Sequence, residues 1–242
     1  VGTEYSDYCN PILSKSLQFN FNKKHFLDTW RLILNDIKNN FDLVFLNNQL
    51  ALINEQSNPF VDYFKTSKFS TVYNITLDSN FNDYKEKIRI KNKKHAYEIH
   101  RTTIKYEKLK KISKNLKITI QDSDHDLIDF NKILEEKKNQ LYRKNINNKL
   151  DNNFKRVFKN LIQLKKIKFY VISLTSENKP LSRCFGFVYN NTFYYYIPVV
   201  LSNSFANYKP GKILILQLIQ WCIKNNINKF DFGLGSEKYK KY

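Results

Sequence analysis

Apolar positions recur along the chain with two periods, one typical of helices and one typical of strands. A spacing of three and four residues predicts amphipathic helices, whereas alternation or a short apolar run predicts a strand. The helical period predicts helices over residues 24–38, 81–111 (as one helix or two), 124–142, 153–165 and 212–225. The second pattern predicts strands over residues 41–46, 70–77, 116–121, 167–174, 181–189, 192–200 and 230–232. Helices and strands are therefore expected to occur together along the whole chain.

Turn residues separate three consecutive strands in the carboxyl-terminal part of the chain. Residues 176–180 lie between the first and second of these strands, and Asn190-Asn191 lies between the second and third. Short polar connections of this kind join antiparallel neighbours, so we expect an antiparallel meander. The helix over 212–225 then leads to the strand over 230–232, which predicts one parallel crossover. The expected fold class is α+β, with mixed and largely antiparallel sheets.

The chain is strongly basic, with 41 Lys and Arg against 22 Asp and Glu and a formal net charge of +19 over 242 residues. Alanine occurs only at Ala51, Ala96 and Ala206, a bias typical of an AT-rich coding sequence, so part of this charge is compositional. The basic residues are dense over 81–111. Two interpretations of this segment stay open: a solvated helical connector, or an electrostatic surface for RNA or a phosphate-bearing substrate.

The cysteines and the hydropathy argue against several classes of protein. Cys9, Cys184 and Cys222 are odd in number and far apart, which favours neither a disulfide framework nor a zinc site. We expect Cys184 to be a small buried apolar residue inside its strand. No run approaches the roughly 18 apolar residues that cross a bilayer, so a soluble cytoplasmic protein is expected. The lack of methionine suggests a piece of a longer chain.

The start of the last helix is a candidate anion site. Lys209, Pro210, Gly211 and Lys212 lead directly into the helix. Backbone N–H groups and the positive end of the helix dipole favour a phosphate there, and the two lysines add charge. A glycine permits close approach of the ligand to the backbone. The segment lacks the pattern of a P-loop, and a proline and glycine before a helix are also common as a plain turn.

The tail after the last strand gathers ionisable groups. Asp231, Gly233, Gly235, Glu237 and Tyr239 occur within nine positions, followed by Lys240. Open α/β sheets place ligands at the carboxyl ends of strands, so these side chains are expected beside the helix start. The alternative interpretation is a strand followed by a glycine turn with solvated charges. In that case Asp231 only caps the turn.

This tail and the preceding glycine-initiated helix resemble the carboxyl-terminal signature of the BioF/CelD-like acetyltransferase domain, a member of the GNAT superfamily related to the FemAB aminoacyl transferases. The resemblance rests on the Asp-x-Gly-x-Gly-x-Glu-x-Tyr-Lys pattern at 231–240, with weaker similarity at 2–8, in the basic middle helices and in the strands over 167–200. Many relatives have tyrosine-aspartate after the meander, where this chain has Leu201-Ser202. A carboxylate for the acceptor is then missing.

The resemblance implies a GNAT fold, in this family often built as two half-domains in tandem, and transfer of an acyl group from acyl-CoA such as acetyl-CoA, without a metal. It implies an amine or hydroxyl acceptor on a small-molecule, cell-envelope or polysaccharide precursor. Carried over to this sequence, Lys209, Gly211, Lys212, Gly235 and Lys240 are the candidate donor-binding residues. The candidate catalytic residues are Asp231, Glu237 and Tyr239, with a carboxylate as base and the tyrosine as proton donor.

We therefore predict an amino-terminal half-domain over 1–78, a basic helical connector over 79–114 and a carboxyl-terminal half-domain over 115–242 that contains the donor site. Two alternatives to acyl-CoA-dependent transfer stay open: a FemAB-like transferase that uses aminoacyl-tRNA, and a non-catalytic RNA-binding module that uses the basic segment. Binding through many phosphates weakens steeply with salt, whereas a CoA pocket responds modestly. Salt dependence therefore separates these predictions.

Overall fold

The computed structural model divides the chain into two compact units, Val1–Phe69 and Ser70–Tyr242. Within them the structure describes residues 8–11, 22–38, 44–53, 56–67, 71–122, 127–146, 150–163, 167–201, 205–235 and 237–241. Outside these ranges lie residues 41–43 of the predicted strand, residues 2–7 of the segment with weaker similarity to the family, and Ser202. We describe each unit separately.

The first unit holds a helix, a short hairpin and one further helical turn. Its elements are α1 (Lys23–Ile37), β1 (Leu52–Ile53), β2 (Gln56–Ser57) and α2 (Pro59–Tyr63). The α1 helix begins where the Asn22 side chain accepts a hydrogen bond from the Lys24 N–H. Phe26 and Trp30 of α1 pack edge-on against Phe60 of α2, with ring centroids 5.0 and 4.9 Å apart. The expected strand over 41–46 is wrong for its described part, because 44–46 form no strand.

The second unit is built on a sheet of six strands. They are β3 (Val72–Thr76), β4 (Lys117–Asp122), β5 (Lys168–Ser176), β6 (Lys179–Tyr189), β7 (Thr192–Val200) and β8 (Lys229–Leu234), in the spatial order β3-β8-β7-β6-β5-β4. Neighbours are antiparallel except β7 and β8, which are parallel. The predicted meander and the single parallel crossover are therefore confirmed.

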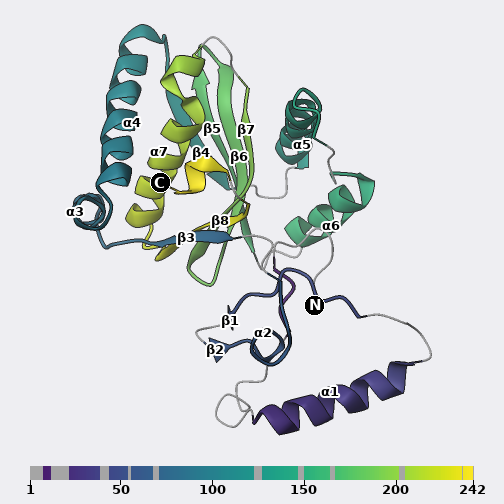
Figure 1. The fold of residues 1–242 in the computed structure, drawn as a ribbon. Coiled ribbons are helices and arrows are strands. Elements are labelled where there is room, and N and C mark those ends of the chain that lie inside the picture. Colours follow the sequence, from purple (N-terminus) through teal and green to yellow (C-terminus); the bar gives the residue numbers. More distant parts are fainter. Residues whose placement is uncertain are drawn as a thin grey trace. The chain divides into compact units, whose positions relative to one another are not determined.

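Helices cover both faces of this sheet (Figure 1). The helices α3 (Phe81–Lys91), α4 (Lys93–Ile112) and α7 (Pro210–Lys224) lie on one face, and α5 (Leu127–Tyr142) and α6 (Asn152–Gln163) lie on the other. Two 3-10 turns, η3 (Ala206–Tyr208) and η4 (Lys238–Lys241), precede α7 and follow β8. None of the helices in the described ranges combines the length and apolar character needed to cross a bilayer.

Aromatic side chains fill the layers on both sides of the sheet. Under α7, Phe193 and Phe230 stack with centroids 5.4 Å apart, and both are fully buried. On the opposite face, Phe130 of α5 and Phe158 of α6 pack near Phe185, whose centroid is 4.8 Å from that of Phe130. The alternation along β7 sends Phe193 to one layer and Tyr196 to the other, where Tyr196 stacks on Phe158. These aromatic residues thus fill the core.

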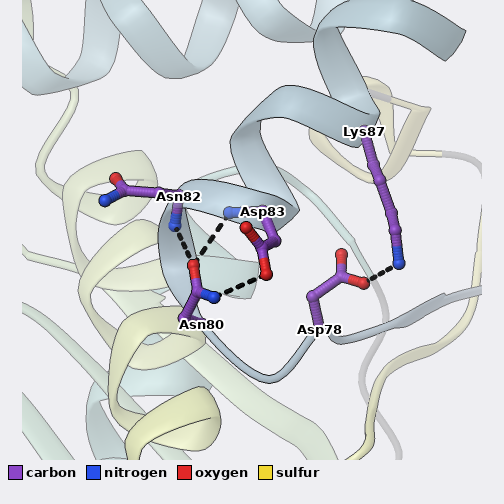
Figure 2. A network of polar contacts seen from close by, with 5 residues as sticks. All are labelled: Asp78, Asn80, Asn82, Asp83 and Lys87. Atoms are coloured by element: carbon purple, nitrogen blue, oxygen red, sulfur yellow. Dashed lines mark hydrogen bonds and ion pairs between the residues drawn. The ribbon is translucent and has the colours of Figure 1, made fainter.

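The start of α3 is fixed by a polar network that Figure 2 shows. The Asn80 side chain accepts hydrogen bonds from the N–H groups of Asn82 and Asp83 at 3.0 and 2.9 Å, and its amide donates to the Asp83 carboxylate at 2.5 Å. Asp78 pairs with Lys87 one turn further along. A capped first turn limits fraying, so it holds Tyr84, the next buried residue of α3, in a defined place.

The two compact units meet between Phe69 and Ser70, and the division at 78 and 114 into half-domains and a connector stays a prediction. The strand β3, expected in an amino-terminal half-domain over 1–78, pairs along β8, with Ile75 opposite Phe230. The expected connector over 79–114 forms α3 and α4, which lie on the α7 face of the main sheet (Figure 1). The physical reason is that β8 needs a hydrogen-bonding neighbour on its outer edge and α7 needs a cover for its apolar side. The chain segment before β4 supplies both.

Candidate functional site

The sheet opens between its two parallel strands. Strands β7 and β8 pair only at Thr192 with Lys229, Phe193 with Phe230 and Tyr194 with Asp231. β7 then continues to Val200 and β8 to Leu234 without further pairing to each other among the described residues. Backbone groups that face the gap at the carboxyl end of β7 therefore have no β8 partner. Open α/β sheets bind ligands at the carboxyl ends of neighbouring strands where the connections diverge.

Side chains of α5 reach this end of β7. The Lys137 ammonium donates a hydrogen bond to the Pro198 carbonyl at 2.8 Å, and the Gln140 amide donates to the Val200 carbonyl at 3.3 Å. Pro198 lies beyond the last β7–β8 pair at Tyr194, and Lys137 gives its carbonyl a side-chain donor there. The α5 helix thereby forms one wall at the open end of the sheet.

The pKa of Lys137, a basic residue of this wall, is shifted from its ordinary value. Burial lowers the pKa of its ammonium, Lys144 and Lys240 lower it further, and Glu237 and the Cys184 thiol act in the opposite direction. These neighbours come from the turn after α5, from β6 and from the tail after β8, so the residue faces the tail that the sequence singled out. The sequence reasoning missed Lys137, because a single lysine on an amphipathic helix has no local signal that distinguishes it from a solvated one.

The start of α7 has one backbone donor available for a ligand. Lys209 is the N-cap in a left-handed conformation (φ 55°), and its carbonyl accepts from the N–H groups of Lys212 and Ile213 at 2.9 and 3.2 Å. Pro210 has no N–H. The Gly211 N–H is the donor of this turn that has no partner among the described residues. An anion at the helix start would therefore bind one backbone N–H, and side chains must supply most of the charge.

Gly211 is required by packing against β7. A Cβ at this position would lie 2.9 Å from Val200 Cγ2, which is closer than side-chain carbons approach. The Ser182 hydroxyl also donates to the Pro210 carbonyl at 3.1 Å and joins the helix start to β6. The glycine therefore brings α7 close to the end of β7. That contact explains the residue whether or not a ligand binds beside it.

Four cations gather around one carboxylate at this helix start. Lys212 lies 2.6 Å from the Glu98 carboxylate of α4, and Arg101 lies 3.7 Å from it. Lys105 donates to the Asn207 carbonyl in η3, and its pKa is lowered by burial and by the charges of Lys209 and Arg101. The Lys212 hydrogen bond holds the pKa of Glu98 below its usual range. We call Arg101, Lys105, Lys209 and Lys212 the cation cluster; its net positive charge suits a polyphosphate.

Two members of this cluster, Arg101 and Lys105, lie in the basic segment over 81–111. The sequence allowed two interpretations of that segment, a solvated connector and a phosphate-binding surface. The fold brings these two side chains to the α7 start, whereas other charges of the segment pair locally. Glu86 with Arg89 and Glu107 with Lys110 are such pairs, at 2.7 and 3.0 Å. The excess of basic residues indicated a phosphate surface but not which residues form it.

Asp231 is engaged by its own turn. Its carboxylate accepts a hydrogen bond from the Gly233 N–H at 2.7 Å, and the residue is buried. Gly233 has a left-handed conformation (φ 70°). This geometry matches the interpretation of Asp231 as a cap for the glycine turn. A catalytic part for it stays a prediction.

The tail after β8 closes on itself through Lys240. The Lys240 ammonium donates to the Leu234 carbonyl at 2.7 Å and lies 3.0 Å from the Glu237 carboxylate. Gly235 lies inside this loop with φ 140°, and a Cβ there would be 2.2 Å from Glu237 Oε2. The predicted donor-binding residues Gly235 and Lys240 therefore form an internal clasp with Glu237. Glu237 itself is about half exposed, with 54% of its side chain accessible.

Tyr239 points from this clasp toward the α7 layer. Its ring packs edge-on against Phe232, with centroids 6.3 Å apart. Burial raises the pKa of the Tyr239 hydroxyl, as do Glu237 and Cys184, so the phenol stays protonated at neutral pH. Cys184 is fully buried, and burial raises the pKa of its thiol, which confirms it as a buried apolar residue rather than a thiolate.

A cavity joins the two groups of predicted site residues. It is bounded by α3, α4, α7 and the strands β3 and β8, and both Lys212 and Tyr239 line it. His95 also lines it; burial and then Lys212 lower its pKa. The structure thus places the helix start and the tail at one cavity, while Asp231 is held by its own turn. Among the described residues, no group of three or more His, Cys, Asp or Glu side chains is arranged for a metal ion.

A mixed sheet that opens beside a basic helix start is typical of a ligand-binding α/β protein. The chain belongs to the acetyltransferase (GNAT) domain family, whose profile matches residues 93–241. Comparison with curated proteins gave no significant match. The predicted GNAT fold is therefore confirmed, and membership of the family supports acyl transfer as the general activity and acyl-CoA as the class of donor. Ile75 and Tyr84 lie before the matched region.

Proposed function

We propose that the protein transfers an acyl group from acyl-CoA to an amine or hydroxyl of a small-molecule, cell-envelope or polysaccharide precursor. The observation that carries this proposal is the opening between β7 and β8 beside the cation cluster. The closer relationship to BioF/CelD-like and FemAB-like proteins is part of the proposal, and it supports the class of acceptor.

The residues at the α7 start fit the phosphates of such a donor. Four cations surround one carboxylate, and the Gly211 N–H is available at the positive end of the helix. When bound, the donor would supply a thioester whose carbonyl carbon is open to attack. Arg101, Lys105, Lys209 and Lys212 would hold its phosphates. Lys137 would position the open end of β7 through its bond to Pro198.

Proton transfers in this reaction would be carried by the tail. The acceptor forms a new C–N or C–O bond and gives its proton to Glu237, whose exposed carboxylate is accessible to an incoming molecule. Tyr239 gives its proton to the sulfur as the C–S bond breaks, which suits a phenol that burial keeps protonated. Asp231 would hold the turn that carries both residues.

Donor binding is tested first by isothermal titration with acetyl-CoA. The variant Arg101→Ala/Lys209→Ala should bind at least roughly tenfold more weakly than the native protein, because charge-assisted contacts to phosphate are lost. The matched control Lys108→Ala/Lys111→Ala removes the same charge from exposed positions of α4 and should bind like the native protein. Equal losses in both variants would contradict a specific phosphate site.

The chemical step is tested with Tyr239→Phe. Loss of a proton donor typically costs about 10²–10⁴-fold in rate, so kcat should fall while donor affinity is retained. An unchanged kcat would remove Tyr239 from the mechanism. If the native protein binds no acyl-CoA but binds tRNA with steep salt dependence, the alternative of an aminoacyl-tRNA-dependent transferase or RNA-binding module replaces this proposal.

A further inference from the structure

The helix α4 has two opposite faces of different character. Its buried residues Ile99 and Leu109 belong to the core that includes α7, and Figure 1 shows α4 on the outside of α7, which lies against the sheet. Residues three, four or seven positions apart share one face of a helix. We call the face opposite the core the outer stripe; its exposed residues at this spacing are Lys93, Tyr97, Ile104, Lys108 and Lys111.

The positive charge of the outer stripe is not neutralised by its own helix. The two acidic residues of α4 are engaged by other cations: Glu98 lies 2.6 Å from Lys212, and Glu107 lies 3.0 Å from Lys110. The three lysines of the stripe have no ion-pair partner among the described residues. Like charges along one face attract a surface of opposite charge. The stripe is therefore suited to an extended anionic partner rather than to a single small anion.

Apolar side chains lie between these lysines. Tyr97 is 60% exposed and Ile104 is 42% exposed, and Ile112 at the end of the helix is 55% exposed. Single exposed apolar residues are common on protein surfaces, but here they share one helix face with unpaired lysines. Helices that lie on a membrane surface combine lysine or arginine with aromatic and aliphatic side chains, because the cations contact anionic headgroups while the apolar groups enter the bilayer boundary.

The apolar residues favour lipid over nucleic acid as the partner. A nucleic acid would use the lysines for its phosphates and could stack a base on Tyr97. Ile104 offers a nucleic acid neither charge, nor a hydrogen-bond donor, nor a ring, whereas a bilayer gives its side chain an apolar environment. None of the helices in the described ranges is long and apolar enough to span a bilayer. The contact would therefore be made at the surface.

We propose that the outer stripe of α4 binds the surface of a bilayer that contains anionic lipids. The lysines of the stripe contact the lipid headgroups, and Tyr97 and Ile104 enter the boundary between headgroups and acyl chains. The same helix carries Arg101 and Lys105 of the cation cluster, so this contact brings the start of α7 close to the lipid surface. The inference goes beyond the proposed acyl transfer and does not depend on it.

The test measures cosedimentation of the full chain with vesicles of phosphatidylcholine alone and of an equal mixture with phosphatidylglycerol. The native protein should bind the mixed vesicles and bind phosphatidylcholine far more weakly. Lys108→Gln/Lys111→Gln should bind the mixed vesicles roughly 25-fold more weakly, because each lysine near an anionic surface contributes about fivefold. The control Lys155→Gln/Lys159→Gln removes the same charge from exposed positions of α6 and should bind like the native protein.

A second pair of variants tests the apolar contact without a change of charge. Ile104→Ser should weaken binding to mixed vesicles roughly threefold or more, because an apolar side chain no longer enters the bilayer. Val157→Ser changes an apolar residue of similar exposure on α6, 38% against 42%, and should bind like the native protein. Each of these surface substitutions should leave the thermal unfolding midpoint nearly unchanged, which shows that the variants are folded.

Three outcomes would overturn the inference. The native protein could fail to bind the mixed vesicles, or the two lysine variants could lose binding equally, which would indicate only the overall charge of the chain. If the native protein binds tRNA more tightly than vesicles and Ile104→Ser changes neither affinity, the outer stripe is a nucleic-acid surface. Vesicle binding is measured without acyl-CoA, so its failure leaves the proposed function standing, and failure of the acetyl-CoA titration leaves this inference standing.

Discussion

Lys212 of α7 lies 2.6 Å from the Glu98 carboxylate of α4, across 114 residues of sequence. This ion pair joins the helix predicted to open the donor site to a helix that was predicted to be part of a connector. Both side chains are mostly buried, with 27% and 19% of their surfaces exposed. The pair therefore ties the phosphate-binding end of α7 to α4.

Replacing Glu98 with glutamine should lower stability by about 1 kcal/mol near neutral pH. The pKa of Glu98 is lowered in the folded state, so its contribution is present above its ordinary value of 4.5 and is lost as pH falls through the folded pKa. The difference between native protein and Glu98→Gln should thus shrink below that pH in urea unfolding. The variant should also bind acetyl-CoA more tightly, because the cation cluster gains net charge. A difference that grows on acidification would contradict the pair.

Lys137→Met should change the pH dependence of stability on the alkaline side. Burial lowers the pKa of Lys137, so folding favours its neutral form, and the cost of burying the charged form disappears as pH rises toward 10.5. The native protein should therefore gain stability relative to the variant over that rise. Loss of the bond to Pro198 should also lower kcat roughly tenfold or more by displacing the end of β7. Lys155→Met, at an exposed position of α6, is the control and should show neither effect.

Gly235→Ala should open the clasp between β8 and the tail. The new Cβ would lie 2.2 Å from Glu237 Oε2 and 2.8 Å from Lys240 Nζ, and φ 140° is strained for any L residue. We expect a loss of about 1–3 kcal/mol, together with faster amide exchange at Lys240. The double variant Gly235→Ala/Glu237→Ala removes the clash with Glu237 but keeps the backbone strain and the close contact with Lys240 Nζ. It should recover only part of the loss, and full recovery would show that φ is not restrictive.

Arg183→Leu should leave the buried carboxylate of Glu136 without its positively charged partner. Arg183 lies 3.0 Å from Glu136, with 12% and 16% of their side chains exposed, and breaking such a pair costs about 3–5 kcal/mol. Burial raises the pKa of Glu136 even beside Arg183. The loss should be largest at neutral pH and should diminish as pH falls through this raised pKa, because protonation removes the buried charge. Arg183→Leu/Glu136→Leu should be close to the native stability, and a double variant as unstable as the single one would contradict this account.

Local sequence patterns predicted most of the elements of the second unit correctly. The apolar periodicity over 212–225 and the turns at 176–180 and Asn190-Asn191 found α7 and the meander, because helix and strand periods and turn chemistry are local properties. The positions of β3 and of α3 and α4 in the fold were not predictable in this way. Edge pairing with β8 and cover for α7 are decided by long-range contacts, which leave no periodic signal.

The candidate site, too, depends partly on local sequence and partly on long-range contacts. The sequence by itself determined which residue types occur around the last helix and the last strand, and it made Lys209, Gly211, Glu237 and Tyr239 candidate site residues. Only the tertiary structure decided their partners. It bound Asp231 and Lys240 into turns, brought Arg101 and Lys105 to the α7 start, and placed Lys137 and Tyr84 at the opening and in the cavity. Desolvation and charge pairing act through space, so the role of an ionisable side chain depends on neighbours that are distant in the sequence.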